Sequence, residues 1–245
     1  MDRAIYTALS AANAALNRQA VTSNNMANSA TAGFRAQLAA FRAVPVEGQT
    51  LKTRALVAES TPYNDDTMGP ITHTGRSLDV ALPQNGWLAV ALPDGSERYT
   101  RNGGIEIDRD GALQVGGKPL MGDGAPLVVP PHSQITIAED GTVSALGAGD
   151  EPTAVVPVGR LKMVNAPMST LIHGDDGLFR PAAGNALPQD DAMRLSPESL
   201  EGSNVSPVKA MTEMIATARS FEMNMKVIRT ADENAQKANQ LLSVG

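Results

Sequence analysis

The sequence has no cysteine, and few of its 245 residues are aromatic. The absence of cysteine excludes disulfide bonds, thiolate metal sites and a cysteine nucleophile. Aromatic residues make up 3% of the chain, with one Trp, three Tyr and four Phe. A buried core therefore has to be built mainly from Ala, Val, Leu, Ile and the 11 Met. A chain of this length accommodates one or two domains.

Long apolar runs and an excess of basic charge are also missing. The chain has no run of 18 apolar residues, and polar residues interrupt its N-terminal segment. We therefore expect neither membrane insertion nor a cleaved secretory signal. The formal net charge of -6 and the pI near 5.1 argue against binding to nucleic acid.

Proline and glycine are almost absent from the two ends of the chain. All 16 Pro lie between positions 45 and 207, and Gly33 and Gly245 are the only Gly outside positions 48–202. Because both residues disfavour a helix interior, we predict long helices within 1–32 and 208–244. Charge follows the same division, since residues 45–207 carry a net charge of -10 and both ends are slightly basic.

The C-terminal segment has apolar residues in a heptad pattern. Five residues lie seven apart: Met214, Phe221, Ile228, Ala235 and Leu242. Three more precede the first three of these by three positions: Met211, Ala218 and Met225. This 3-4 spacing is typical of a coiled-coil seam. Ser206 and Pro207 are suited to cap and begin the helix.

The N-terminal segment has the same spacing. Its apolar seam contains Ile5, Leu9, Ala12 and Leu16 and reaches Met26 through Gln19 and Ser23. Each segment alone is compatible with an ordinary amphipathic helix on its own domain. Two such helices at opposite ends of one chain favour packing on each other and on neighbouring subunits. The residues expected to pack between subunits are Ile5, Leu9, Leu16, Met26, Met211, Met214, Phe221, Met225, Ile228 and Leu242.

The middle of the chain has the pattern of short antiparallel strands. Apolar residues alternate with others at 78–82, 105–108 and 135–137, and five Asp-Gly pairs supply turns. We predict an α+β fold with a coiled-coil-like rod domain formed by long N- and C-terminal helices, and a central all-β domain. The expected boundaries are 1–34 and 206–245 for the helical domain, 35–75 for an extended connector and 76–201 for the β domain.

Signals for catalysis and metal binding are sparse. The three His lie in separate contexts, without the spacing of a metal site. The adjacent acidic pairs are expected in solvated turns, because neighbouring side chains usually point apart. We predict no enzyme activity, metal or cofactor. One alternative is a secreted binding module that uses the loops of the β domain, including Asp175 and Asp176.

Three regions of the sequence, the two ends and the centre, resemble one family. The N-terminal stretch is Asn25-Met26-Ala27-Asn28 followed by Thr31 and Gly33-Phe34. The C-terminal stretch is Leu200-Glu201-Gly202-Ser203-Asn204-Val205. The central stretches are Asp79-Val80-Ala81-Leu82 and Tyr99-Thr100-Arg101-Asn102-Gly103. Together they resemble the bacterial flagellar rod and hook proteins, and the opening residues and total length are similar to the proximal rod members. Distal rod or hook-type members are the alternative.

The resemblance implies a structural subunit that polymerises into a helical drive shaft and transmits motor torque across the periplasm. It implies copies of the chain and other proximal and distal rod subunits as partners. It also implies the flagellar type III export gate as a partner during secretion, with Phe34 and Leu38 similar to the export signal that the gate reads. The family signature residues are Asn25, Ala27, Asn28, Thr31, Gly33, Ser203, Asn204 and Val205.

Overall fold

The computed structural model describes residues 2–45, 55–131, 133–147, 155–174 and 176–243. The chain divides into two compact units. The terminal unit contains Met1–Ser29, Ala36–Asp65 and Val205–Gly245, and the β unit contains Ala30–Arg35 and Asp66–Asn204. Each unit is thus assembled from segments that are far apart in the sequence.

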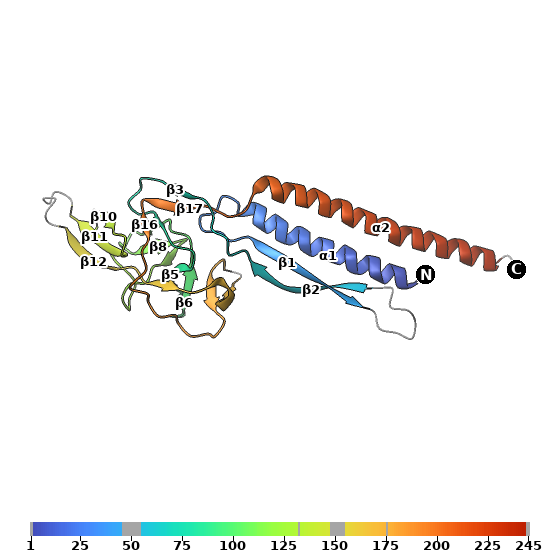
Figure 1. The fold of residues 1–245 in the computed structure, drawn as a ribbon, viewed down its shortest axis with the longest axis horizontal. Coiled ribbons are helices and arrows are strands. Elements are labelled where there is room, and N and C mark those ends of the chain that lie inside the picture. The colour runs from blue at the N-terminus through green and yellow to red at the C-terminus, as the bar shows by residue number, and fades with distance from the viewer. Residues whose placement is uncertain (1, 46–54, 132, 148–154, 175, 244–245) are drawn as a thin grey trace. The chain divides into compact units, whose positions relative to one another are not determined.

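The terminal unit consists of two antiparallel helices and a β-hairpin (Figure 1). Helix α1 (Asp2–Ala27) packs against helix α2 (Pro207–Ser243) and against the hairpin of β1 (Gln37–Pro45) and β2 (Ala55–Asn64). The two strands are antiparallel, with a register shift between Leu38 and Ala40. Helix α2 is about 55 Å long at roughly 1.5 Å per residue. It begins as predicted, because Pro207 is its first residue and the hydroxyl of Ser206 accepts a bond from the amide of Lys209 at 3.5 Å.

The expected coiled-coil-like rod domain was wrong. The structure has a hairpin as a third layer beside the helices, and the inward faces of the helices are lined largely by small or polar residues. The buried residues of α1 are Ala8, Ala12, Ala15 and Thr22, and those of α2 are Ala210 and Thr217. Small side chains allow the two helix backbones to approach closely, but they supply too little apolar volume for a coiled-coil core. The hairpin covers a further face of α1.

In each helix, one of the two predicted seam rows faces inward and the other is displaced by one position. In α1, the buried Ala8 and Ala15 lie beside Leu9 and Leu16, which are 45% and 51% exposed. In α2, the row of Met214, Phe221 and Ile228 is half-buried as the heptad pattern suggested. The second inward row is, however, Ala210, Thr217, Asn224, Ala231 and Ala238, one position before the predicted Met211, Ala218 and Met225.

The β unit is built from short antiparallel strands, as predicted. Its strands and one 3-10 helix are β3 (Ile71–His73), β4 (Val80–Ala81), β5 (Gly86–Ala91), β6 (Glu97–Thr100), β7 (Glu106–Ile107), β8 (Leu113–Val115), β9 (Lys118–Pro119), β10 (Gln134–Ile137), β11 (Thr142–Leu146), β12 (Val156–Arg160), β13 (Met163–Asn165), η1 (Met168–Thr170), β14 (Leu171–His173), β15 (Phe179–Pro181), β16 (Ser196–Pro197) and β17 (Ser199–Glu201). The largest sheet has the order β13-β5-β6-β15-β14, and two three-stranded sheets have the orders β10-β11-β12 and β7-β8-β9. Two-stranded pairs, β16-β4 and β17-β3, join the end of the unit to its beginning.

Two apolar clusters fill the β unit. The larger is aliphatic and includes Val80, Leu88 and Leu161, which are fully buried. The smaller surrounds Trp87, whose indole nitrogen donates a hydrogen bond to the carbonyl of Ala166 at 2.9 Å and whose ring lies 4.7 Å from that of Phe179. All five Asp-Gly pairs place their Gly at positive φ, between 75° and 92°, which confirms the predicted turns.

The segment expected as an extended connector, 35–75, contributes to both units. Residues 36–65 belong to the terminal unit and contain β1 and β2, whereas β3 pairs with β17 in the β unit. The β unit also extends beyond the predicted 76–201, because it includes residues 30–35 and 66–75. Paired strands thus replace the expected linker.

Candidate assembly surface

The structure groups no residues for metal binding in the part of the chain that it describes. Within these residues, no three His, Asp or Glu side chains are placed to hold a metal ion. His73 is exposed and His173 is half-buried, while His132 and Asp175 lie outside the described residues. No described helix has the length and hydropathy needed to cross a bilayer.

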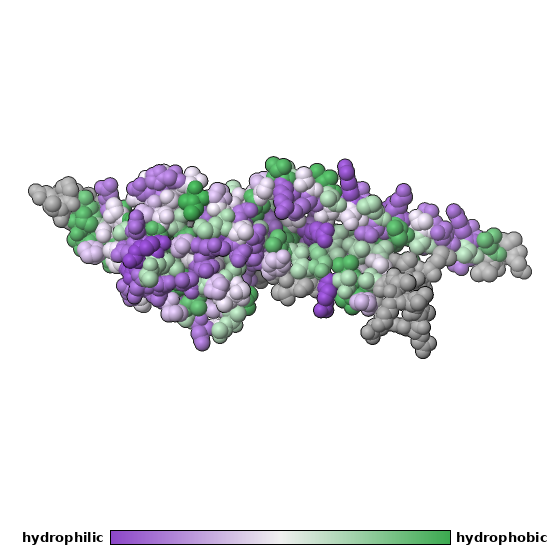
Figure 2. All heavy atoms as spheres, in the orientation of Figure 1, coloured by the Kyte–Doolittle hydropathy of each residue, from purple (hydrophilic) through white to green (hydrophobic). Residues whose placement is uncertain are grey.

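The terminal unit instead exposes many large apolar side chains. On α1 these are Tyr6, Leu9 and Leu16, and on α2 they are Val208, Met211, Ile215, Met223, Val227 and Leu241. Val44, Val57 and Tyr63 add to them from the hairpin. Figure 2 shows hydrophobic atoms over α1 and the hairpin on the face turned to the viewer, with isolated hydrophilic side chains between them. Helices with an inward and an outward apolar face are typical of chains that pack against a partner.

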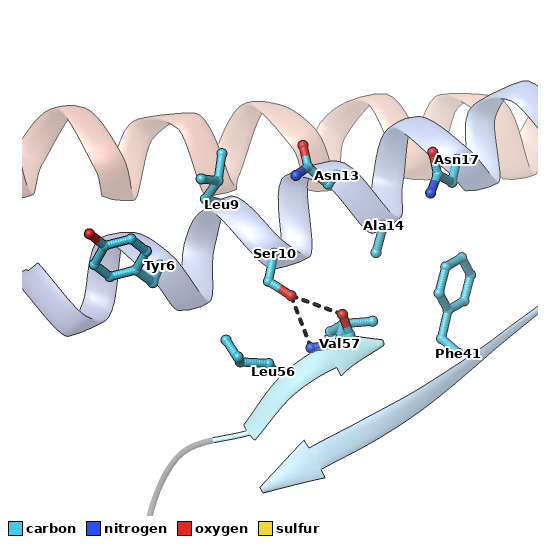
Figure 3. Close-up of a pocket in the computed structure, with 9 residues that line it drawn as sticks. All are labelled: Tyr6, Leu9, Ser10, Asn13, Ala14, Asn17, Phe41, Leu56 and Val57. Atoms are coloured by element: carbon cyan, nitrogen blue, oxygen red, sulfur yellow. Dashed lines mark hydrogen bonds between the residues drawn. The ribbon is translucent and has the colours of Figure 1, made fainter. Parts of the chain in front are cut away.

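A groove of about 330 Å³ lies between α1 and the hairpin (Figure 3). Its apolar lining consists of Tyr6, Leu9, Ala14, Phe41, Leu56 and Val57, and its polar lining of Ser10, Asn13 and Asn17. The hydroxyl of Ser10 donates to the carbonyl of Val57 and accepts from its amide, both at 3.0 Å. This bridge fixes the hairpin on the helix, so the groove has a defined shape. We call this groove, together with the exposed apolar residues of α1 and α2, the assembly surface.

The residues predicted to pack between subunits have different environments in the single chain. Leu9, Leu16 and Met211 belong to the assembly surface. Six others are half-buried within the terminal unit: Ile5, Met26, Met214, Phe221, Met225 and Ile228. The side chain of Leu242 lies outside the described residues. Sequence reasoning missed Tyr6 and the groove residues of the hairpin, because nothing local indicated that β1 and β2 pack on α1.

The N-terminal signature fixes the end of α1 and the start of the hairpin. The side-chain amide of Asn25 donates to the carbonyl of Gln37 and accepts from its amide, each at 2.8 Å. Asn25 therefore pairs with β1 much as a neighbouring strand would. Asn28 donates to the carbonyl of Asn24, and the hydroxyl of Ser29 donates to that of Met26, so the last helical carbonyls are satisfied. Ala27 is the last residue of α1 and is exposed.

In the β unit, the same signature continues as a tightly packed turn. Gly33 has φ +66°, and its amide donates to the carbonyl of Glu201 at 2.8 Å. A Cβ atom at this position would lie 2.4 Å from the backbone carbonyl atoms of Arg101. Only glycine combines this φ with this approach of two backbones. Thr31, which is exposed, closes the turn by accepting a bond from the amide of Phe34 at its carbonyl.

The C-terminal signature lies against this turn. The amide of Asn204 donates to the carbonyl of Phe34 at 3.2 Å, and its side chain donates to the carbonyl of Thr67 at 3.0 Å. Ser203 is buried in the β unit, whereas Val205 is half-buried in the terminal unit. The two signatures, which are far apart in the sequence, are thus hydrogen-bonded to each other.

A buried charge cluster joins these segments, and sequence reasoning did not identify it. Arg35 and Arg101 are each 2% exposed, and Glu201, which pairs with both, is 1% exposed. Arg101 also lies over the Trp87 ring, 5.6 Å from its centre. A signal was available, since Arg35 follows Gly33-Phe34 and Glu201 lies within the C-terminal stretch. We had interpreted these stretches only as a family pattern.

The two residues proposed as an export signal are both half-buried in the folded chain. Phe34 belongs to the signature turn of the β unit. Leu38 belongs to β1 in the terminal unit, where it is paired with Tyr63.

Comparison with known proteins identifies the family. Three family models match: "Flagella basal body rod protein" at residues 5–35, "Flagellar hook protein FlgE/F/G D1 domain" at 81–145 and "Flagellar basal body rod FlgEFG protein C-terminal" at 196–241. The flagellar basal-body rod proteins FlgF of Salmonella typhimurium and Escherichia coli are each 56% identical to this chain, with full coverage of both chains. The flagellar basal-body rod protein FlgG of Agrobacterium fabrum is 33% identical, over 95% of this chain and 97% of that protein. The chain therefore belongs to the family of flagellar basal-body rod proteins, and it is a structural subunit of the rod.

Proposed function

We propose that the chain polymerises through its assembly surface as a subunit of the proximal rod. The observation that carries this proposal is the second apolar face on each terminal helix. An exposed groove on α1 and an exposed apolar face on α2 are different surfaces, so a contact between them on neighbouring subunits is heterologous. A heterologous contact that does not close into a ring generates a helical filament. The half-buried seam residues, Met214, Phe221 and Ile228 among them, support the surface from within.

The partners follow from the same surface. Copies of this chain and other proximal and distal rod subunits would bind it, and the assembly would lie in the periplasmic part of the basal body. Full-length likeness to FlgF exceeds that to FlgG, which favours the proximal over the distal rod. We propose no catalytic role, because the relatives are named for a structural part of the flagellum.

We further propose that the chain leaves the cytoplasm unfolded, without a cleaved secretory signal, through the type III export gate. Phe34 and Leu38 are half-buried in the folded chain, so the gate has full access to them only before folding. Cells that carry Phe34→Ala or Leu38→Ala are expected to retain the subunit in the cytoplasm. Normal export of both variants, measured by cell fractionation, would show that Phe34 and Leu38 are not the export signal.

Assembly is tested by replacing Leu9 and Leu16 with Ser. About half of each side chain is exposed, so complete burial at a contact contributes roughly 0.7–1.5 kcal/mol per residue. Losing both contacts weakens association by about tenfold to a hundredfold. Ala20→Ser, at another exposed position of α1, is the matched control.

We expect isolated basal bodies to lack complete rods in the double variant and to contain them in the control. Circular dichroism should show that the control melts like the wild type and that the double variant still folds, with a lower melting temperature because about half of each leucine side chain is buried within the subunit. Complete rods in the double variant would contradict the proposed surface.

A further inference from the structure

Every covalent connection between the two units passes through three short segments of the β unit. The chain crosses between the units after residues 29, 35, 65 and 204. The connecting segments on the β-unit side are therefore 30–35, the residues that follow 65, and those that precede 205. Any force between the units along the chain enters the β unit through these segments.

One carboxylate oxygen of Glu201 binds the first two segments. Oε1 forms an ion pair with the guanidinium of Arg35, whose Nη2 lies 2.8 Å away. It also accepts from the backbone amide of Gly69 at 3.0 Å. Glu201 itself belongs to the third segment. A single side chain thus holds all three.

The other oxygen connects the segments to the core of the β unit. Oε2 accepts from Nε and Nη2 of Arg101 at 2.9 and 2.6 Å. The remaining donors of Arg101 bind the carbonyls of Leu82, Pro83, Gln84 and Gly86, at 2.7–3.1 Å. Leu82 belongs to the larger apolar cluster, and β5 begins at Gly86. The guanidinium of Arg101 therefore connects the carboxylate to the turn before β5.

Backbone contacts hold the three segments in register around this carboxylate. The amide of Gly33 donates to the carbonyl of Glu201 at 2.8 Å, and that of Gly202 donates to the carbonyl of Pro70 at 2.8 Å. A Cβ atom on Gly69 would lie 2.0 Å from the carbonyl oxygen of Gly202. The segments therefore touch through their backbones, and no side chain separates them.

The buried charges make these contacts sensitive to loss of the Glu201 carboxylate. Two guanidinium groups share one carboxylate, and all three groups are buried. Removing the shared partner of a buried ion pair leaves uncompensated buried charge, which is strongly unfavourable. The carboxylate of Glu201 is the only group of the three that contacts both others.

We propose that Glu201 is a positioning residue for torque transmission, through which mechanical load passes from the three connecting segments into the core of the β unit. We call Arg35, Arg101 and Glu201 the clasp. The inference rests on the assignment as a rod subunit, because only a subunit under torque needs such a path. It predicts that loss of the carboxylate loosens the connecting segments without loosening the separate sheet that contains β10.

Glu201→Gln tests the clasp, because it removes the charge and keeps the shape. Asp191→Asn is the control, since it breaks an ion pair with Arg160 in which the Asp191 carboxylate is largely exposed. Hydrogen exchange on the purified full chain is expected to become at least tenfold faster at the amides of Gly33 and Gly202 in Glu201→Gln. Exchange in β10, which belongs to a separate sheet, should change less than twofold, and the control should match the wild type.

Flagellar rotation provides the functional readout. Cells with Glu201→Gln as their only copy are expected to rotate normally at low viscous load and to lose rotation, with broken rods, at high load. Unchanged exchange at Gly33 and Gly202 would overturn the proposal. Equal acceleration in β10 would overturn it too, because Glu201 would then be an ordinary stabilising residue of the whole unit. Equal impairment of rotation at both loads would also overturn it.

A second variant decides the question if Glu201→Gln does not fold. Arg35→Met frees only the first segment and leaves the pair of Arg101 and Glu201 in place, so faster exchange is expected at Gly33 and not in β5. Exchange at Gly33 that matches the wild type would overturn the proposal. Normal rods in cells that lack the whole chain would contradict its proposed function as a rod subunit. This result is distinct from the results above, which test only the clasp.

Discussion

Gly33→Ala should cost the β unit far more stability than Gly75→Ala, although the two residues have nearly the same backbone conformation. Their φ angles are +66° and +71°. An Ala at either position has to adopt a left-handed conformation, which is unfavourable by about 1–2 kcal/mol. A new Cβ at Gly75 has no atom within 4 Å, so this cost is the whole effect there.

At position 33 the new methyl group also collides with backbone. It would lie 2.4 Å from the carbonyl carbon and oxygen of Arg101 and 2.6 Å from the amide nitrogen of Asn102. Backbone atoms cannot move aside as the end of a side chain can, so the segment that carries the Arg101 guanidinium must shift. Overpacking of this kind costs about 1–3 kcal/mol beyond the conformational term. The total for Gly33→Ala is then about 2–5 kcal/mol.

Thermal unfolding followed by fluorescence measures this difference. Trp87 is the one tryptophan of the chain and is buried in the β unit, so its emission reports on that unit alone. Each 1 kcal/mol corresponds to roughly 2–4 °C in a domain of this size, so Gly33→Ala should melt about 2–12 °C below Gly75→Ala. Equal melting temperatures in the two variants would refute the argument from close approach.

Three further changes have defined outcomes. Asn25→Ala removes both bonds to Gln37, so hydrogen exchange at Gln37 should accelerate, with a cost of about 1–3 kcal/mol; unchanged exchange would contradict this. Burial raises the pKa of Tyr99 from its ordinary 10.0 to about 12, so its contribution to stability is complete below pH 10 and is lost as pH rises toward 12. Tyr99→Phe should therefore flatten the alkaline decline seen in denaturant titrations. Hydrogen bonds from Thr142 lower the pKa of Asp140 below its ordinary 3.8, so its contribution is present above pH 3.8 and is lost as pH falls further. Asp140→Asn should reduce the acid sensitivity, and identical acid profiles would contradict this assignment.

Local features of the fold were predictable because their causes are local. The Asp-Gly turns need only a glycine at positive φ, and the start of α2 needs only Ser206 and Pro207. The broad α+β division followed from the distribution of proline and glycine for the same reason. Each of these depends on residues that are adjacent in the chain.

The coiled-coil expectation failed because spacing does not say which of two adjacent rows faces inward. Ala8 and Ala15 have the same heptad spacing as Leu9 and Leu16, and we assumed that the larger residues would be buried. In the structure the alanines are buried and the leucines are exposed. Two helix backbones that approach closely need the smaller row between them, which leaves the larger row outside.

Long-range contacts gave no local signal. The strands β1 and β2 show no clear alternation of apolar and polar residues. Their packing on α1 depends on Asn25 and Ser10, which resemble ordinary helix residues. The clasp depends on an ion pair between Arg35, near the N-terminus, and Glu201, near the C-terminus. Charged residues in a sequence are usually expected at the surface, so their burial emerges only from the folded arrangement.

Site-specific photo-crosslinking in flagellated cells tests the central claim, that the outward apolar faces of the terminal unit bind neighbouring rod subunits. A crosslinking amino acid would be placed at Leu9, at Leu16 and, as the inward control, at Ala12, which is 2% exposed. The account predicts crosslinks to a second rod subunit from positions 9 and 16 and none from position 12. Crosslinks from position 12 alone, or from none of the three in assembled rods, would contradict it.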